Sequence, residues 1–301
     1  MSVELVRISS ANINLSDHEP PTEWDGEAEA LARALRERTS GEVRFDDGSR
    51  ALYATDASNY RQVPIGVVIP RTNDDVIATM ATCREFGAPI LARGGGTSLA
   101  GQCCNVAIVM DFSKYMNKIL EINKEERWAR VQPGVVLDSL RKEASKVGLT
   151  FGPDPATHNR CTLGGMIGND SCGVHSVMAG RTVDNVEELD ILTYDGLRMT
   201  VGETSDSDFE AIMRAGGARA EIYARMRALR DRYADLVRAR YPKITAWRAA
   251  PATTSLGCDA RACAGSAPDM TATSARIEAT TAMTRSRWPD EDASVPIALP
   301  P

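Results

Sequence analysis

The residues of this chain whose types and spacing best suit chemistry form a glycine-rich segment at positions 89–102. It reads Pro-Ile-Leu-Ala-Arg-Gly-Gly-Gly-Thr-Ser-Leu-Ala-Gly-Gln. Three consecutive glycines weaken a helix or a strand, so their value lies in a backbone that another group can approach closely. Exposed N–H groups beside the hydroxyls of Thr97 and Ser98 suit an anion, and a diphosphate is the usual ligand of such a loop. The segment therefore predicts a diphosphate site, with a plain surface turn as the alternative.

The spacing of these glycines excludes two common nucleotide-binding motifs. The phosphate loop of nucleoside triphosphatases needs a lysine directly after its last glycine, and no lysine follows here. The dinucleotide motif of the Rossmann fold needs a helix after its glycines. The apolar run 106–110 instead follows Gly101 almost at once and predicts another strand. The segment therefore belongs to neither class.

A second glycine cluster lies within residues 152–175. Pro153 and Pro155 stiffen an extended segment, and Asn169 and Ser171 add side chains that can form hydrogen bonds. The glycines that again permit close approach are Gly164, Gly165, Gly168 and Gly173. Two such loops in one domain predict a long ligand that is held from both sides.

Several motifs, in a consistent order, resemble the FAD-binding half of the vanillyl-alcohol-oxidase superfamily. They are Pro70-Arg71-Thr72-Asn73-Asp74-Asp75-Val76, Arg93-Gly94-Gly95-Gly96-Thr97-Ser98-Leu99-Ala100-Gly101, Thr162-Leu163-Gly164-Gly165-Met166-Ile167-Gly168-Asn169 and Gly180-Arg181-Thr182-Val183-Asp184-Asn185-Val186. The similarity runs from about Tyr60 to about Gly202, and the nearest branch is that of the D-lactate, glycolate and D-2-hydroxyglutarate dehydrogenases. The resemblance implies an α/β (α+β) fold of the PCMH type, in which FAD lies between two subdomains. It also implies that a D-2-hydroxy acid is oxidised by hydride transfer to the flavin.

The resemblance further implies which residues hold FAD. In the family the first loop wraps the diphosphate, the second lines the diphosphate and the flavin, and the backbone of a valine, here Val186, pairs with adenine. The predicted FAD-binding residues are Arg93, Gly94, Gly95, Gly96, Thr97, Ser98, Gly101, Gln102, Pro153, Thr162, Gly164, Gly165, Gly168, Asn169, Gly173 and Val186. Arg93 is either a counter-charge to the diphosphate or a surface arginine at a strand end. Members with covalently attached flavin carry a histidine just after the first glycines; Thr97 stands there, so the resemblance implies non-covalent FAD.

No residue is assigned a catalytic role from the sequence. His158 and His175 are the only histidines inside the domain, and either could accept a proton near neutral pH. A lone histidine is more often structural or solvent-exposed, because catalysis needs convergent partners. Two alternatives to a hydroxy-acid dehydrogenase stay open: an FAD oxidase of another branch that acts on a sugar or an aromatic alcohol, and a non-catalytic flavin-binding fragment.

Composition limits the protein's class. The 301 residues are 43% apolar and carry a net charge of −6, which argues against nucleic-acid binding. The sequence contains no apolar run long enough for a transmembrane segment and no secretory leader, so we expect a cytoplasmic protein. The seven scattered cysteines match no ligand or disulfide spacing, which predicts free thiols and no metal site.

Apolar periodicity and turn residues predict the elements that position the two loops. After an N-terminal lead-in and helix (1–59, with the helix at 27–38), the first subdomain (60–112) has strands at 67–69, 90–92 and 106–110 and a helix at 73–86. The second subdomain (113–205) has strands at 119–122, 128–131, 186–193 and 197–201 and a helix at 136–147. An Asp195-Gly196 pair predicts the hairpin turn between the last two strands. A long charged helix over 218–241 then completes the FAD-binding domain (60–242).

Residues 243–301 lose this periodicity, and we assign no packed element to them. Family members continue instead into a substrate-capping domain, to which nothing here corresponds. The abrupt change predicts a disordered or out-of-frame tail on a truncated chain. The partner expected from the resemblance is a small hydroxy acid, with the electron acceptor left open.

Overall fold

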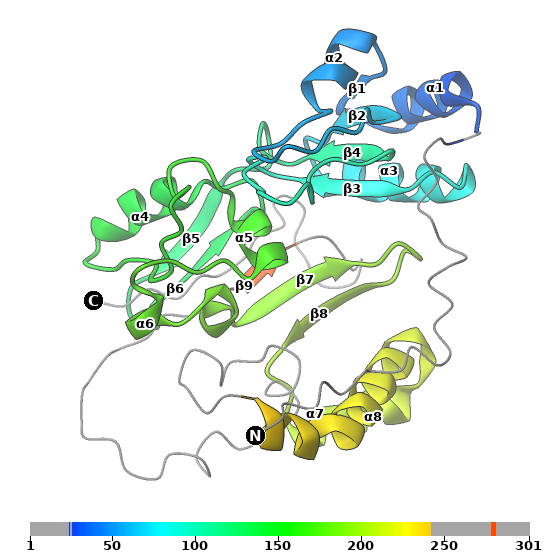
Figure 1. Ribbon diagram of the computed structural model, residues 1–301. Coiled ribbons are helices and arrows are strands. Elements are labelled where there is room, and N and C mark those ends of the chain that lie inside the picture. The colour runs from blue at the N-terminus through cyan, green and yellow to red at the C-terminus, as the bar shows by residue number, and fades with distance from the viewer. Residues whose placement is uncertain (1–23, 25, 242–277, 281–301) are drawn as a thin grey trace, which may run out of the picture.

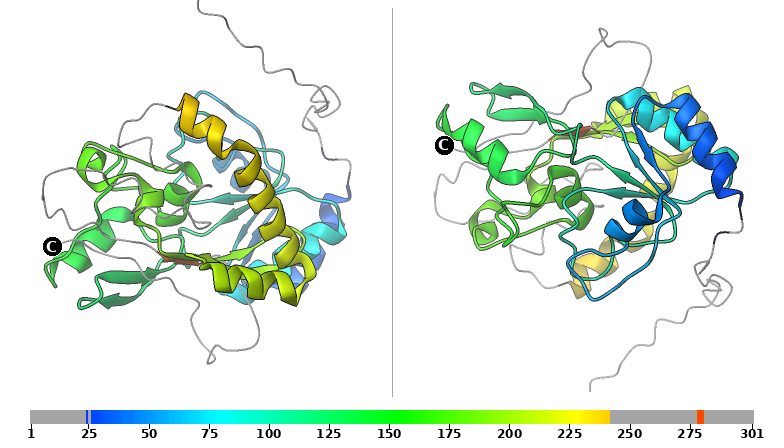
Figure 2. Two further views of the ribbon diagram at one scale, coloured as in Figure 1. Left: turned by 90° about the horizontal axis from the view of Figure 1, so that it is seen from below. Right: turned by 90° about the horizontal axis from the view of Figure 1, so that it is seen from above.

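The computed structural model describes residues 24, 26–241 and 278–280. Two β-sheets account for its strands, and Figure 1 places one sheet above the other, with helices packed around both. Residues 112–118 lead from the last strand of the first sheet to the first strand of the second. Figure 2 shows the same arrangement from below and from above.

The first sheet has the strand order β1-β2-β4-β3. Its strands are β1 (Glu42–Arg44), β2 (Gly66–Ile69), β3 (Ile90–Arg93) and β4 (Ile108–Asp111). The central strands β2 and β4 are buried along their whole length, which explains their continuous apolar sequence. Strands β2, β3 and β4 run parallel, whereas β1 pairs antiparallel at one edge. The carboxyl ends of three parallel strands therefore meet at one edge of the sheet.

Three helices accompany this sheet: α1 (Ala28–Arg38), α2 (Asp47–Leu52) and α3 (Asn73–Glu85). Helix α3 begins at Thr72 with a capping box, in which the Thr72 hydroxyl and the Asp75 carboxylate each accept a backbone N–H of the other residue. Helix α1 is held by Leu31 and Leu35, which are fully buried. The sheet thus uses β1 and α1, both of which precede the segment predicted as the first subdomain.

The second sheet has the order β5-β6-β9-β7-β8. Its strands are β5 (Ile119–Asn123), β6 (Trp128–Val131), β7 (Glu188–Leu192), β8 (Arg198–Gly202) and β9 (Glu278–Thr280). Strands β7 and β8 form the predicted hairpin, and Gly196 adopts a φ of 86° at its turn. Strand β9 pairs in parallel with both β6 and β7. We assigned no element to this part of the chain, and a three-residue strand leaves too short a pattern to detect.

Helix α4 (Leu137–Ser145) packs against this second sheet. The side chains that it buries, Leu137, Leu140 and Ala144, follow the predicted helical spacing. They join Phe151 and Met166, both fully buried, in one apolar core. Gly148, at a φ of 78°, ends the turn after the helix as the sequence indicates.

Short helices replace much of the predicted second glycine loop. Residues Leu163–Asn169 form helix α5, Ser176–Ala179 form α6, and Thr182–Asn185 form a 3₁₀ turn. The sequence did not predict this helix, because glycine disfavours helix interiors and α5 contains three glycines. The buried side chains of Leu163 and Met166 stabilise it nevertheless. We predicted a second loop within residues 152–175, and helix α5 shows that this was wrong for residues 163–169.

The described chain continues with α7 (Asp206–Ala215) and the long helix α8 (Gly217–Arg240). The sequence predicts α8 but not α7. The two helices pack through the rings of Phe209 and Tyr223, whose centroids lie 6.2 Å apart. Helix α8 lies beyond β8, at the far side of the second sheet from the first sheet (Figure 1).

Candidate functional site

The two glycine-rich segments meet in the folded chain. We call residues 94–101 the first glycine loop and residues 164–173 the second glycine cluster. A Cβ atom built on Gly94 would lie 1.9 Å from Thr162 Oγ1, and one on Gly95 would lie 2.3 Å from the carbonyl oxygen of Arg160. The backbone of the first loop therefore rests directly on the residues that lead into α5. Only glycine permits so close an approach.

The first glycine loop starts at the carboxyl end of β3, the edge of a parallel sheet at which ligands usually bind. From Gly94 to Thr97, no backbone N–H donates to an acceptor within the described residues. Gly96 and Gly101 adopt φ values of 63° and 78°, which turn the loop back on itself. Four successive unpaired N–H groups in a partly exposed loop need an outside acceptor.

Arg93 fixes this loop rather than offering its charge to a ligand. Its guanidinium donates to the carbonyls of Tyr53 at 3.1 Å, Cys103 at 2.9 Å and Thr55 at 2.8 Å. It also lies over the Tyr53 ring, 5.2 Å from the centroid. The sequence suggests a counter-charge to the diphosphate or a surface arginine. Neither interpretation anticipates a side chain that ties residues 53–55 to Cys103.

A buried tyrosine–aspartate pair supports the same edge of the sheet. Tyr53 donates its hydroxyl to Asp111 Oδ2 at 2.6 Å, and the other carboxylate oxygen accepts the Ser113 N–H. Burial, followed by the hydrogen bond to Asp111, raises the pKa of Tyr53, so its hydroxyl stays protonated and keeps donating. No local sequence signal links positions 53 and 111.

The far end of the first glycine loop rests on Tyr60. A Cβ on Gly101 would lie 2.8 Å from Cγ of that ring. Ser98 contacts Gln102 across the turn, and Leu99 between them leaves 79% of its surface exposed. The predicted residues Ser98, Gly101 and Gln102 are thus brought together at the tip of the loop.

The second glycine cluster differs in how its N–H groups are used. Gly164 donates to the Pro133 carbonyl at 2.9 Å, and Gly165 donates to Thr162 Oγ1 at 3.4 Å. The next residue, Met166, bonds the Thr162 carbonyl at 2.8 Å. The first-turn N–H groups of α5 are therefore satisfied within the protein. Thr162, 1% exposed, serves as the N-cap of α5.

The glycines of this cluster also have unequal surroundings. A Cβ on Gly164 would lie 2.8 Å from Pro133 Cβ, and one on Gly173 would lie 2.0 Å from the Asp154 carbonyl oxygen. Gly168 has no atom within 4 Å of that position, and Asn169 beside it is exposed. Gly164 and Gly173 thus permit protein packing, while Gly168 and Asn169 face open space.

Both histidines of the domain are held by carboxylates. His175 Nδ1 lies 2.5 Å from Asp154 Oδ2, and its backbone N–H donates to Oδ1 at 2.9 Å. His158 Nδ1 lies 2.8 Å from Asp138 Oδ2. Burial opposes ionisation of Asp154, but the hydrogen bonds from His175 outweigh it and hold its pKa below the ordinary value. The contacts of His175 with Asp154 hold the end of the second cluster against residues 152–155.

The remaining predicted residues lie at the margins of this arrangement. Pro153 is buried next to Asp154, and Val186 is half-buried against the core of the second sheet. Asn185, ahead of Val186, donates to the carbonyls of Ala179 and Arg181 at 2.9 and 2.7 Å. The Gly-Arg-Thr motif is therefore tied back to the end of α6.

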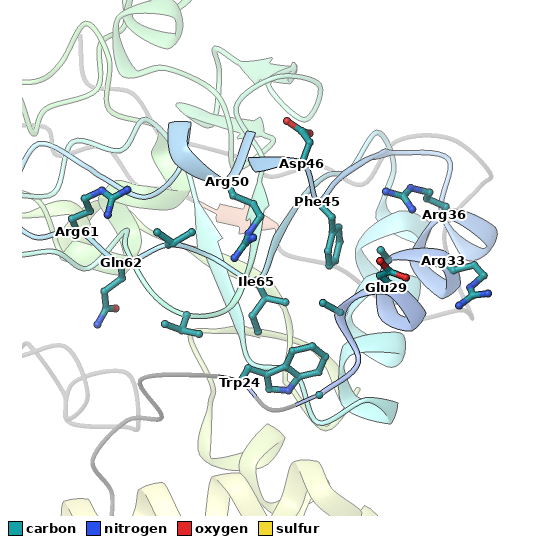
Figure 3. A pocket seen from close by; sticks show the side chains of 15 residues that line it. Trp24, Glu29, Arg33, Arg36, Phe45, Asp46, Arg50, Arg61, Gln62 and Ile65 are labelled. Atoms are coloured by element: carbon teal, nitrogen blue, oxygen red, sulfur yellow. The ribbon is translucent and has the colours of Figure 1, made fainter. Parts of the chain in front are cut away.

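A cavity of about 1160 Å³ lies elsewhere, at the amino ends of β2 and β4 (Figure 3). Trp24, Phe45 and Ile65 line its apolar side, and Arg50 and Arg61 reach its rim. None of the predicted FAD-binding residues lines it. Among the described residues, no group of three or more His, Cys, Asp or Glu side chains could hold a metal ion.

Comparison with known proteins identifies the segment that contains both glycine-rich regions. Residues 64–202 match the family model described as FAD binding domain. D-2-hydroxyglutarate dehydrogenase of Pseudomonas putida is 39% identical over 207 residues, which cover 68% of this chain and 21% of that protein. Glycolate oxidase subunit GlcD of Bacillus subtilis is 39% identical over 165 residues, 53% of this chain and 35% of that subunit. The chain thus spans about a fifth to a third of these relatives' lengths.

Solved structures support the fold. An alkyldihydroxyacetonephosphate synthase superposes with a TM-score of 0.53 at 22% identity, covering 61% of this chain and 40% of that one. A carbohydrate oxidase from Microdochium nivale gives 0.52 at 18% identity, covering 60% and 38%. At these identities the similarity concerns the fold alone. The predicted α/β fold of the PCMH type is confirmed.

The residues present fit the diphosphate of FAD at the first glycine loop. A diphosphate offers several anionic acceptors, and Gly94 to Thr97 offer successive donors without partners in the described structure. The exposed Gly95 leaves the backbone accessible from solvent. The second cluster fits a part of FAD other than the diphosphate. It presents the Asn169 side chain and the open face at Gly168 rather than free N–H groups.

Proposed function

We propose that this chain, whose residues 64–202 form an FAD-binding domain of the vanillyl-alcohol-oxidase superfamily, is the flavin-holding part of a D-2-hydroxy-acid dehydrogenase. The observation that carries the proposal is the row of unpaired N–H groups from Gly94 to Thr97, set against the backbone of residues 160–162. The relatives named D-2-hydroxyglutarate dehydrogenase and glycolate oxidase support the substrate class.

In this proposal the first glycine loop binds the diphosphate, and Arg93 holds that loop in its binding conformation. The second cluster, with Thr162, Gly168 and Asn169, lines the flavin side of the site. Val186 offers its backbone to adenine. Bound FAD would accept two electrons as a hydride equivalent from the carbon that bears the substrate hydroxyl.

Attachment of FAD is non-covalent in this proposal. Thr97 occupies the position at which the resemblance places a flavin-bearing histidine, and the histidines of the domain, His158 and His175, pair with Asp138 and Asp154 instead. Denaturation should therefore release all of the flavin into the supernatant. Flavin that stays with the precipitated protein would contradict this point.

A non-catalytic flavin-binding unit is the second candidate. The chain covers 21% of the P. putida relative, and no residue of the described structure is assigned a catalytic role. The two candidates share the FAD site and differ in whether substrate electrons reach the flavin.

The decisive experiment is the absorption spectrum of the purified chain after reconstitution with FAD. Binding should give a flavin spectrum that persists through gel filtration. Anaerobic addition of D-2-hydroxyglutarate, D-lactate or glycolate should bleach it, with L-2-hydroxyglutarate and L-lactate as controls for the two chiral substrates. Retained colour without bleaching supports the second candidate, and failure to retain FAD overturns both.

The described helices include none that is long and apolar enough to cross a membrane. On the sequence composition alone, we propose that the protein works in the cytoplasm. The substrate partner in this proposal is a small hydroxy acid.

A further inference from the structure

Helix α8 differs from the rest of the chain in its charge. Its 24 residues carry seven arginines and three acidic residues, a net charge of +4, whereas the whole chain carries −6. Only Ala220 and Tyr223 are buried. Its first half packs on α7 through Tyr223 and Met226, and its second half has no buried residue. A basic helix that is half free of packing suggests a surface for an anionic partner.

Apolar side chains are exposed along the second half of α8. Leu229, Tyr233 and Leu236 expose 52%, 39% and 45% of their surfaces. At 3.6 residues per turn these three positions fall within about 60° of one another around the helix. We call them the α8 stripe. In the left panel of Figure 2, seen from below, α8 runs across the near face of the molecule.

The arginines that flank the α8 stripe have no acidic partner in the described structure. They are Arg225, Arg232 and Arg240, and by helical geometry they lie within about 60° of Leu229 on the wheel. Arg232 instead lies over the ring of Tyr233, 5.1 Å from its centroid. Their charges are therefore available beside the exposed apolar groups.

The arginines farther from the stripe are paired. Arg227 lies 3.5 Å from Glu210, Arg230 lies 2.8 Å from Asp231, and Arg238 lies 2.9 Å from Asp235. Asp231 and Asp235 fall on the side of the helix opposite the stripe. Asp231 and Asp235 thus face away from the α8 stripe with their arginine partners, whereas Arg225, Arg232 and Arg240, without an acidic partner in the described structure, border the apolar groups.

We propose that α8 docks on an anionic lipid bilayer surface, with the α8 stripe in the headgroup layer and Arg225, Arg232 and Arg240 on lipid phosphates. Leucine and tyrosine suit the interface, and arginines beside them can extend toward phosphates while their methylenes stay on apolar surface. A second copy of the chain fits less well, because a symmetric contact would bring these arginines against each other. This inference does not depend on the proposed flavin chemistry.

The test is co-sedimentation of the full chain with vesicles. One set contains phosphatidylcholine alone, and the other contains equal parts of phosphatidylcholine and phosphatidylglycerol. We expect binding to the anionic vesicles only, weakened by added salt because exposed charges are screened. Arg225→Gln with Arg232→Gln should weaken it about 25-fold, since each cation near such a surface contributes about fivefold.

Matched variants separate docking from general charge and folding effects. Arg227→Gln with Arg238→Gln removes the same number of charges from the paired side and should change binding about twofold at most. Leu229→Gln with Leu236→Gln should weaken binding about tenfold, because the stripe loses its apolar contact. Leu52→Gln, at a side chain that is 72% exposed on α2, should leave binding unchanged.

Three results would overturn the proposal. They are absence of binding to anionic vesicles, equal loss in the two arginine pairs, and a dimer in solution that only the stripe variants dissociate. The last result would assign the α8 stripe to a second copy. Circular dichroism on each variant checks that α8 is intact, and the flavin spectrum is not a readout of this experiment.

Discussion

The first glycine loop and the second glycine cluster resemble each other in sequence and differ in what their glycines do. In the first loop, Gly94 and Gly95 bring an unpaired backbone against residues 160–162. In the second cluster, Gly164 and Gly173 let α5 and the 170–173 turn pack on Pro133 and Asp154. Glycine-rich sequence therefore signals close approach, but it does not say whether a ligand or the protein itself approaches.

The secondary structure around each segment explains the difference. Residues 163–169 are helical, so most of their N–H groups bond within the helix or to its cap. Residues 94–97 follow a strand and adopt no repeating structure, so their N–H groups stay unpaired. Substitutions in the first loop should thus affect FAD binding, and those at the packed glycines of the second cluster, Gly164 and Gly173, should affect stability.

Gly95→Val should have the largest effect. Its side chain would fill the space against Arg160 and displace the N–H groups that we assign to the diphosphate. We expect FAD to bind at least about 100-fold more weakly, the equivalent of losing two charge-assisted hydrogen bonds. Fluorescence titration of the apoprotein with FAD measures this change. The free energy of unfolding should fall by only about 1–3 kcal/mol, as for other overpacked sites.

The outcome that contradicts this assignment is specific. A Gly95→Val protein that keeps its FAD affinity would show that the diphosphate lies elsewhere. A variant that fails to fold is replaced by Gly95→Ala, which adds only the Cβ atom 2.3 Å from the Arg160 carbonyl oxygen. The same loss of affinity, on a smaller scale, is then expected.

Arg93→Lys should weaken FAD binding about tenfold. A lysine keeps the positive charge but cannot reach three carbonyls from one planar group, so the first loop loses its support. The free energy of unfolding should fall by about 2 kcal/mol, at about 1 kcal/mol for each lost hydrogen bond. Arg33→Lys, at an exposed position of α1, is the control for the effect of replacing an arginine by a lysine; it should leave FAD affinity unchanged. Equal affinity in Arg93→Lys and wild type would mean that the loop needs no such support.

Much of the fold could be predicted because its signals are local. The parallel strands β2, β3 and β4 follow apolar runs, α3 follows its capping residues, and the β7–β8 hairpin follows Asp195-Gly196. Helices α2, α5, α6 and α7 and the strands β1 and β9 were missed. Two of these are three-residue strands whose existence depends on neighbours in the sheet, and α5 depends on burial of Leu163 and Met166 despite its glycines.

The site was predictable only in part. The sequence indicates which loops are rich in glycine and that both serve one ligand, and the structure brings them into contact. It does not indicate that Arg93 reaches Tyr53 and Cys103, or that Asp154 holds His175. These contacts join residues 10 to 40 positions apart, and no pattern in one sequence links them.

Gly164→Ala and Gly168→Ala should separate packing from binding in the second cluster. The Gly164 Cβ would meet Pro133, so we expect a loss of about 1–2 kcal/mol in the free energy of unfolding. Gly168 has open space and lies inside α5, so alanine there should add up to about 1 kcal/mol. Urea denaturation of the apoproteins measures both. Because we assign Gly168 to the flavin side of the site, we expect Gly168→Ala to weaken FAD binding while it gains stability; unchanged FAD affinity would mean that the flavin does not lie against α5.

The smallest expected effect concerns pH. The clamp on the first loop joins a guanidinium to neutral carbonyls and does not titrate in acid, whereas the clamp on the second cluster uses the Asp154 carboxylate. Because the folded pKa of Asp154 lies below its ordinary value of 3.8, its stabilisation is complete above about pH 4. It is lost as the pH falls through the lower folded pKa.

Asp154→Asn should therefore lower the free energy of unfolding by less than about 1 kcal/mol near pH 6, and the difference from wild type should shrink toward about pH 3. Urea denaturation across this range measures the difference, which cancels the contribution of the other carboxylates. Asp47→Asn is the control, since the Asp47 side chain is fully exposed. If the difference in the free energy of unfolding between Asp154→Asn and wild type stays constant with pH, His175 and Asp154 hold the second cluster by packing and not by charge. Gly173 already packs in this way against the Asp154 carbonyl.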